Sequence, residues 1–255
     1  MGHLDGRRIL VTGASAGIGA AVARRAVHDG ASVALVARNR EPLEALAREL
    51  GSAAVAVPGD VADATSIAAA VDRAVDALGG LDGLVNSAGV ARPDRIADAR
   101  PADWQRTFDV NVIGLLQATQ AAIPHLRAAA GAGDDARTPA VADVVNVSSM
   151  SGRRRPSIEM TVYSASKFAV HLLSDGLREE LAEDGIRVSV ISPGFVRTAI
   201  FDSDGPDATL ERYRERMEAT GLEADTIADQ IAYVLAQPPG VSVHEIASMS
   251  LRQPR

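Results

Sequence analysis

The sequence predicts an α/β fold with one doubly wound parallel sheet in a single domain, and three observations lead to this prediction. Short apolar runs alternate with helical patterns along all 255 residues. Several of these runs end in glycine or small polar residues, as buried strands do before a loop. Only 3% of the residues are aromatic while 47% are hydrophobic, so aliphatic side chains must fill the core.

The first predicted unit is a strand at 9–11, a glycine-rich loop at 12–19 and a helix that runs to His28. The loop reads Thr-Gly-Ala-Ser-Ala-Gly-Ile-Gly. Glycine lets a ligand approach the backbone, and unpaired N–H groups at a helix start favour an anion. We therefore expect the pyrophosphate of a dinucleotide here. The alternative is a glycine-rich turn that only allows close helix packing.

The second strand, 32–37, ends in Ala37-Arg38-Asn39. In a dinucleotide-binding fold this strand end meets the adenosine ribose, and a carboxylate there favours NAD. A guanidinium instead favours the 2′-phosphate of NADP(H) through charge-assisted hydrogen bonds. We expect NADP(H) as the cofactor, and a solvated loop arginine is the alternative.

A third strand is predicted at 53–57 and a fourth at 81–85. After the third, Asp60 could accept from the adenine amino group, whereas Asp63 is placed to cap the next helix. After the fourth, residues 86–89 read Asn-Ser-Ala-Gly, small enough for a cofactor to lie against the backbone. An ordinary Asn-Gly turn is the alternative.

One long helix is predicted from Pro101 through Ile123. Asn111 lies among its apolar residues and is either bonded to its own helix or used for function. The segment 129–140, with its glycines and Pro139, is expected to be a flexible surface connection.

The fifth strand, 141–147, delivers the hydroxyls of Ser148, Ser149 and Ser151 to the edge of the sheet where ligands bind in open α/β folds. Three arginines follow at 153–155. They could attract an anionic substrate, and an exposed loop cluster is the alternative.

Tyr163 and Lys167 lie four positions apart in a predicted helix that runs to Leu181. This spacing puts both on one helix face. A lysine cation beside a tyrosine favours the phenolate and lowers the pKa of the phenol, so the pair could exchange a proton with a carbonyl oxygen. The alternative is a half-buried tyrosine beside a lysine that reaches solvent.

The sixth strand, 186–191, is followed by Ser-Pro-Gly, which restricts the backbone where a nicotinamide would end. The polar stretch at about 197–222 is expected to form a substrate lid. A helix at 225–236 and a last strand at 241–246 complete the prediction.

Composition excludes several kinds of function. The chain has no cysteine, so disulfides and thiolate chemistry are excluded. The five histidines are scattered without ligand spacing, so we expect no metal. A net charge of -7 argues against a nucleic acid or an anionic membrane as partner. No signal peptide or membrane span is apparent, and we expect a cytoplasmic protein.

Taken together, these motifs resemble those of the short-chain dehydrogenase/reductase family. They are the loop Thr-Gly-Ala-Ser-Ala-Gly-Ile-Gly, Asn-Ser-Ala-Gly at 86–89, Asn111, Ser149, Tyr163-x-x-x-Lys167 and Pro193-Gly194. The resemblance covers nearly all of residues 1–255. It implies a compact, seven-stranded Rossmann domain of an NADP(H)-preferring branch that assembles as a homodimer or homotetramer.

The resemblance also implies an oxidoreductase that interconverts the carbonyl of a small aldehyde or ketone and an alcohol by hydride transfer. A non-catalytic NADP(H)-binding sensor or structural relative is the alternative. Tyr163 would be the general acid/base, Ser149 would hold the substrate oxygen, Lys167 would lower the pKa of Tyr163, and Asn111 would anchor a water. Expected cofactor contacts are Gly13, Ser15, Ala16, Gly17, Ile18, Gly19, Arg38, Asn39, Asp60, Val61, Asn86, Ala88, Gly89, Tyr163, Lys167, Pro193, Gly194, Val196 and Thr198.

Overall fold

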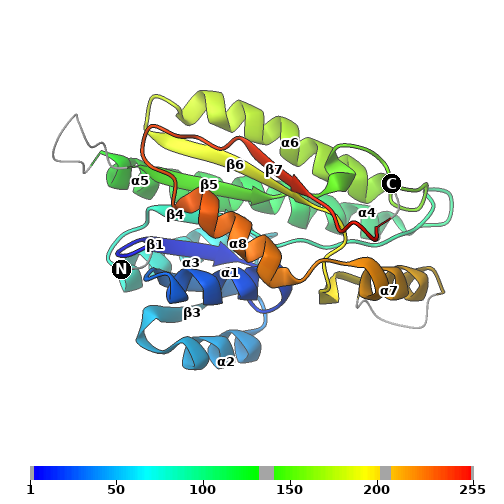
Figure 1. The fold of residues 1–255 in the computed structure, drawn as a ribbon, viewed down its shortest axis with the longest axis horizontal. Helices are drawn as coiled ribbons and strands as arrows, with labels where there is room; N and C mark the ends of the chain where they lie inside the picture. Colours follow the sequence, from blue (N-terminus) through cyan, green and yellow to red (C-terminus); the bar gives the residue numbers. More distant parts are fainter. Residues whose placement is uncertain (1–2, 132–140, 202–207, 254–255) are drawn as a thin grey trace.

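The computed structural model describes residues 3–131, 141–201 and 208–253. Within them seven strands form one parallel sheet in the order β3-β2-β1-β4-β5-β6-β7 (Figure 1). The strands are β1 (Arg8–Thr12), β2 (Ser32–Ala37), β3 (Ala54–Pro58), β4 (Gly83–Asn86), β5 (Ala142–Val147), β6 (Ile186–Pro193) and β7 (Glu245–Ser248). The predicted fold class is confirmed. Most of the connection expected at 129–140 lies outside the described residues.

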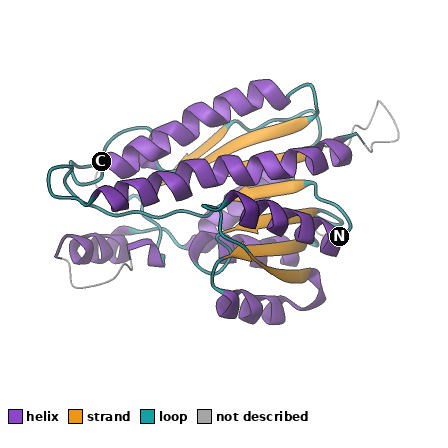
Figure 2. Ribbon diagram, turned by 180° about the vertical axis from the view of Figure 1, so that it is seen from behind, coloured by secondary structure: helices purple, strands orange, loops and turns teal. Residues whose placement is uncertain are grey.

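Helices cover both faces of the sheet. They are α1 (Gly17–His28), α2 (Arg40–Leu50), α3 (Ala64–Leu78), α4 (Pro101–Phe108), α5 (Gly114–Ala130), α6 (Thr161–Leu181), α7 (Ala208–Thr220) and α8 (Ala224–Leu235), with the short turns η1 (Gly51–Ala53), η2 (Asp109–Ile113), η3 (Met150–Gly152) and η4 (Ala199–Phe201). Helices α1 and α8 lie side by side in front of the sheet in Figure 1, and Figure 2 shows the opposite face from behind. No helix in the described parts of the chain is long and apolar enough to cross a membrane.

The side chains on the two faces of the sheet pack into two separate hydrophobic cores. Along β1, Ile9 and Val11 pack with α1 and α8, whereas Leu10 packs with α3 and α5 on the other side. This alternation follows from the two-residue period of a strand. Because both faces are covered, every position of β6 is buried.

The long helix predicted from Pro101 to Ile123 is interrupted by the π-helical turn η2, which contains Asn111. The Asn111 side chain accepts from the Val90 N–H at 2.9 Å and donates to the Val90 carbonyl at 2.9 Å. Asn111 is therefore bonded to the loop after β4 and not to its own helix. Such wide turns accommodate an extra residue and frequently occur at functional sites.

The last strand was predicted at 241–246 and is observed at Glu245–Ser248. The reason is the Arg187 guanidinium, which binds the backbone carbonyls of the segment before β7. It donates to the carbonyls of Gln237, Pro238 and Val241 at 2.9, 3.1 and 2.9 Å. These carbonyls turn toward one side chain, so the chain joins β6 only beyond them.

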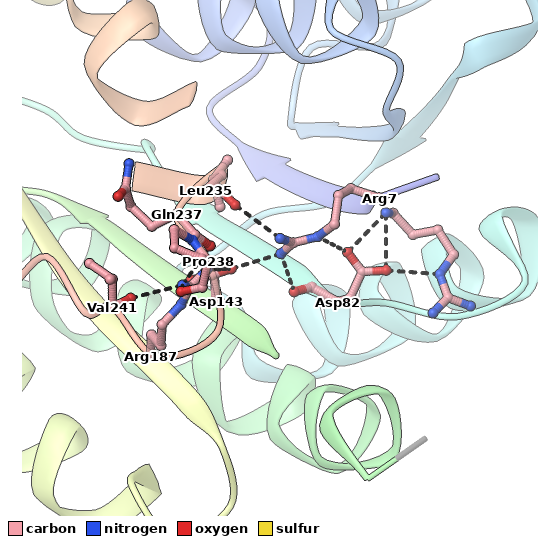
Figure 3. Close-up of polar contacts among 9 residues, drawn as sticks. Arg7, Asp82, Asp143, Arg187, Leu235, Gln237, Pro238 and Val241 are labelled. Carbon is pink, nitrogen blue, oxygen red and sulfur yellow. Dashed lines mark hydrogen bonds and ion pairs between the residues drawn. The ribbon is translucent and has the colours of Figure 1, made fainter. Parts of the chain in front are cut away.

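Buried charges tie the amino ends of the strands together (Figure 3). Asp143 on β5, 1% exposed, accepts from Arg187 at 2.8 and 2.9 Å and from Arg7 at 2.8 Å. Arg7 also donates to Asp82 at 2.6 Å and to the Leu235 carbonyl at the end of α8 at 3.0 Å. Paired and hydrogen-bonded in this way, the charges can be buried.

Asp143→Asn should lower the free energy of unfolding by about 3–5 kcal/mol, because it leaves the Arg187 guanidinium buried without its counter-charge. Urea unfolding monitored by circular dichroism measures this. Arg24→Ala is the control, since Arg24 and its partner Glu49 are half exposed and their pair contributes at most about 1 kcal/mol. Equal losses in the two variants would contradict the assignment.

Candidate functional site

A cleft of about 560 Å³ runs along the carboxyl ends of strands β1 to β6. Every residue expected to contact the cofactor lines it except Asn86, and so does Ser149. Asn111 lies just behind the lining, since a Cβ on Gly89 would lie 3.5 Å from its Oδ1. Among the described residues, no three His, Asp or Glu side chains gather as metal ligands would.

The glycine loop forms the cradle at one end of the cleft. Gly13 and Gly17 have positive φ angles of 68° and 56°. A Cβ on Gly13 would lie 2.7 Å from Ala88 Cα, and one on Gly17 would lie 3.0 Å from a Thr198 methyl group. Ala16, which precedes α1, makes no side-chain capping bond. The N–H groups of the first helical turn thus remain for an anionic ligand, and the cradle fits a pyrophosphate.

The residues expected at the adenosine end lie together after β2 and β3. Arg38 and Asn39 are exposed and line the cleft. Arg38 makes no side-chain hydrogen bond or ion pair with any residue that the structure describes, and Asp60 also faces the cleft. Asp63 accepts from the Ser66 N–H at 2.8 Å and caps α3, as predicted.

Asn86 lies outside the cleft, in the interior between the sheet and the helices. Its amide donates to Thr119 Oγ1 at 3.0 Å and to Asn146 Oδ1 at 2.9 Å. Asn146 in turn donates to Ser174 Oγ at 2.9 Å. Asn86 thus links β4 with β5, α5 and α6. Its side chain is a structural contact, whereas the small residues after it line the cleft.

Ser149 and Tyr163 place two hydroxyls in the middle of the cleft. Of the candidate serines, Ser149 is the one whose side chain lowers the pKa of the Tyr163 phenol. The Ser149 hydroxyl is held by the Ser151 N–H at 3.1 Å. Ser148 turns away and donates to the Lys167 carbonyl at 3.3 Å. Ser149 and Tyr163 both line the cleft, and the role of Ser149 stays a prediction.

Lys167 is the single lysine of the chain, and its ammonium is buried beside Tyr163. Its Nζ donates to the Val147 carbonyl at 2.9 Å and lies 5.9 Å from the centroid of the Tyr163 ring. Asn111 reaches the same helix, donating to Ser166 Oγ at 3.1 Å. The four residues predicted to be catalytic are therefore neighbours at one place.

The pKa values of the pair differ from the sequence prediction. Burial raises the pKa of Tyr163 to about 12, and only the hydrogen bond from Ser149 opposes it. Burial also lowers the pKa of Lys167 to about 8. For both groups, removal from water is therefore the main cause of the pKa shift. Near pH 7 the Tyr163 phenol is protonated and can donate a hydrogen bond.

One wall of the cleft is apolar, and it is formed mainly by the segment that the sequence predicts as a lid. Tyr213 and Met217 of α7 are buried and pack with Met160 and Phe201. The Tyr213 hydroxyl lies 2.5 Å from Ser157 Oγ, which ties α7 to the loop before α6. The helical spacing of apolar residues in this otherwise polar segment was the available signal. The lid prediction falls on this region, of which 202–207 lie outside the described residues.

The C-terminal tail also reaches the cleft, which the sequence did not indicate. Gln253 Oε1 accepts from the Phe195 N–H at 2.8 Å. The Gly194 N–H donates to the Ser248 carbonyl at 2.7 Å, and a Cβ on Gly194 would overlap Gln253 Oε1. A side chain at position 194 would therefore displace the Gln253 amide from the Phe195 N–H.

A parallel sheet whose strand ends and glycine loop enclose one cleft defines a dinucleotide-binding α/β protein. Residues 7–209 match the short chain dehydrogenase family. An uncharacterized oxidoreductase of Staphylococcus epidermidis is 36% identical over 237 residues, which cover 93% of this chain and 94% of the relative. The chain therefore belongs to the short-chain dehydrogenase family of oxidoreductases.

Two solved structures show the same fold. A short chain dehydrogenase from Burkholderia cenocepacia, in complex with NADP, is 33% identical with a TM-score of 0.81, covering 96% of this chain and 98% of that one. A 3-ketoacyl-(acyl-carrier-protein) reductase from Brucella melitensis, complexed with NADH, is 29% identical with a TM-score of 0.85, covering 98% and 100%. Structures of this shape thus hold either dinucleotide.

Lys167 should titrate at about 8 in the cofactor-free protein instead of near 10.5. Because it is the single lysine, selective ¹³C-lysine labelling gives one Cε signal whose chemical shift can be followed with pH. If the midpoint of this titration lies near pH 10.5, the Lys167 cation is not destabilised by burial and the prediction is wrong.

The same shift makes stability depend on pH. Between pH 8 and 10.5 the unfolded lysine holds a proton that the folded one has lost, so the free energy of unfolding rises with pH by up to about 3 kcal/mol. Lys167→Met removes this rise. The free energy of unfolding of the Lys167→Met variant, compared with that of the unchanged protein, should therefore fall between pH 8 and pH 10.5.

Proposed function

We propose that the protein is an NADP(H)-dependent oxidoreductase that interconverts the carbonyl of an aldehyde or ketone and an alcohol. The observation that supports this best is the position of the Ser149 and Tyr163 side chains, which both line the cleft and lie close enough for Ser149 to lower the pKa of the Tyr163 phenol. A protonated phenol and a serine hydroxyl can both donate to one carbonyl oxygen. Beside them the cradle at Gly13 and Gly17 leaves room for a dinucleotide.

NADP(H), when bound, supplies the hydride to the carbonyl carbon or takes it from the alcohol. The N–H groups at the start of α1 would hold the pyrophosphate, and Arg38 would hold the 2′-phosphate. Arg38 supports this because it faces the cleft without an acidic partner among the described residues. Pro193, Val196 and Thr198 would border the nicotinamide end.

Tyr163 would donate its proton to the substrate oxygen as negative charge develops there. The phenol is suited to this role because burial keeps it protonated near neutral pH. Ser149 would donate a second hydrogen bond and hold the oxygen in place. Lys167 would supply positive charge beside the phenolate that results, and that charge favours the ionised form. In the oxidative direction the Tyr163 phenolate would accept the proton of the alcohol.

The remaining expectations belong to the same proposal. The enzyme would act in the cytoplasm on a small-molecule substrate, and the segment at about 197–222 would close over it as a lid. It would assemble as a homodimer or homotetramer. In support, α6 exposes Phe168 and Leu172, at 47% and 74%, apolar residues of the kind that interfaces cover.

Tyr163→Phe should lower turnover by about 100-fold or more, because the proton donor is lost while the ring is retained. NADPH binding, followed by nicotinamide fluorescence, should persist. Tyr233→Phe is the control, since that residue is 57% exposed on α8. Full turnover in Tyr163→Phe would refute the mechanism, and binding without turnover in the unchanged protein would favour a sensor.

Arg38→Ala should reduce the preference for NADPH over NADH by about tenfold to a hundredfold, because one charge-assisted contact to the 2′-phosphate is lost. The ratio of the two kcat/KM values measures this. Arg40→Ala is the matched control, since Arg40 pairs with Glu44 at 3.3 Å and does not line the cleft. An unchanged ratio in Arg38→Ala would remove Arg38 from the phosphate site.

A further inference from the structure

The cleft is lined by cations although the chain as a whole is acidic, with 33 acidic and 26 basic residues. Besides Lys167, the described residues that line the cleft include five arginines and one carboxylate, that of Asp60. The arginines are Arg38, Arg106, Arg154, Arg155 and Arg216. A concave site of one charge sign concentrates ligands of the opposite sign. The cofactor phosphate accounts for Arg38 but not for the arginines on the substrate side.

Arg154, Arg155 and Arg216, called here the rim arginines, approach the cleft from two segments. The first two lie in the loop between η3 and α6, and Arg216 lies on α7. The hydrogen bond between Ser157 and Tyr213 joins these segments. The Arg216 guanidinium carbon lies 5.9 Å from the centroid of the Phe195 ring, on the apolar wall of the cleft.

Neighbouring arginines on the same segments behave differently. Arg153 pairs with Glu245 at 3.7 Å and Arg214 pairs with Glu211 at 3.0 Å, and neither lines the cleft. The rim arginines have no carboxylate partner within the described residues. Arg154 donates only to the Met249 sulfur at 3.7 Å. On these two segments, the arginines that pair with a carboxylate thus lie outside the cleft, and those without a carboxylate partner among the described residues lie at its rim.

A guanidinium without a partner, next to apolar walls, binds a carboxylate or a phosphate through parallel N–H donors. We infer that the substrate is a carbonyl compound bearing a carboxylate or phosphate group, which the rim arginines bind while the carbonyl lies at Ser149 and Tyr163. Phe195, Tyr213 and Met217 would contact the hydrocarbon between the two ends. This inference rests on the proposed function and specifies its substrate class.

The test compares matched pairs of substrates that differ only in charge. One series consists of oxo acids of increasing chain length, each with its methyl ester, and another of phosphorylated ketones with their dephosphorylated parents. We expect kcat/KM with NADPH to be at least about tenfold higher for the anion of the better series, chiefly through KM. The preference should fall as salt is added. Which series responds identifies the group as carboxylate or phosphate.

The variants Arg216→Gln and Arg155→Gln should each reduce the preference for the anion by about tenfold. Arg214→Gln and Arg153→Gln are the matched controls on the same two segments and should keep it. If the protein turns over an anion and its neutral partner equally well, the inference is wrong, while the proposed reductase function still stands. The inference is also wrong if the control and rim variants lose the preference for the anion equally. That result would indicate attraction by the overall positive charge and not binding by particular arginines.

Thermal unfolding provides a reading that does not need turnover. The Tyr163→Phe protein, saturated with NADPH, should show a higher Tm with the preferred acids than with their esters. Arg216→Gln added to this protein should remove the difference. If no compound is turned over by the unchanged protein but the acid-specific rise in Tm is present, the proposed reaction fails and the anion site stands. If the rise is absent, the anion site fails.

Discussion

Because all strands of the sheet are parallel, their carboxyl ends meet at one edge and their amino ends at the other. The carboxyl edge holds the glycine loop, Ser149 and the loop at Pro193, so residues far apart in sequence form one cleft. The amino edge holds the charges of Arg7, Asp82, Asp143 and Arg187. The ion pairs stabilise one edge of the sheet, and the opposite edge remains available for a ligand.

The buried charges at the two edges of the sheet differ in whether they have a counter-charge among the described residues. Asp143 is surrounded by guanidinium groups, which stay protonated at any ordinary pH, so its environment is permanently neutralised. Lys167 is the chain's single lysine, and among the residues that the structure describes it has a carbonyl but no carboxylate as partner. Burial therefore lowers its pKa to about 8. A lysine, whose charge responds to its surroundings, would suit the proposed proton transfer better than an arginine.

Local patterns predicted what depends on neighbours in sequence. The glycine loop, the Asp63 cap and the burial of alternating strand residues all follow from spacing and residue type. Features that depend on distant partners were predicted incorrectly or missed. The last strand begins late because Arg187 holds the carbonyls before it, and Asn86 turns inward because Thr119 and Asn146 are there. The pKa of Tyr163 likewise depends on burial that no spacing reveals.

The contact between Gln253 and the Phe195 N–H has a consequence for how such enzymes diversify. Gln253 belongs to no strand or helix, so its replacement removes no packing from either core of the sheet. Yet it holds the backbone beside Gly194 at the wall of the cleft. Exchange of Gln253 would therefore change that wall while both cores of the sheet keep their packing. If the proposed function holds, the tail is a place where substrate choice can change at little loss of stability.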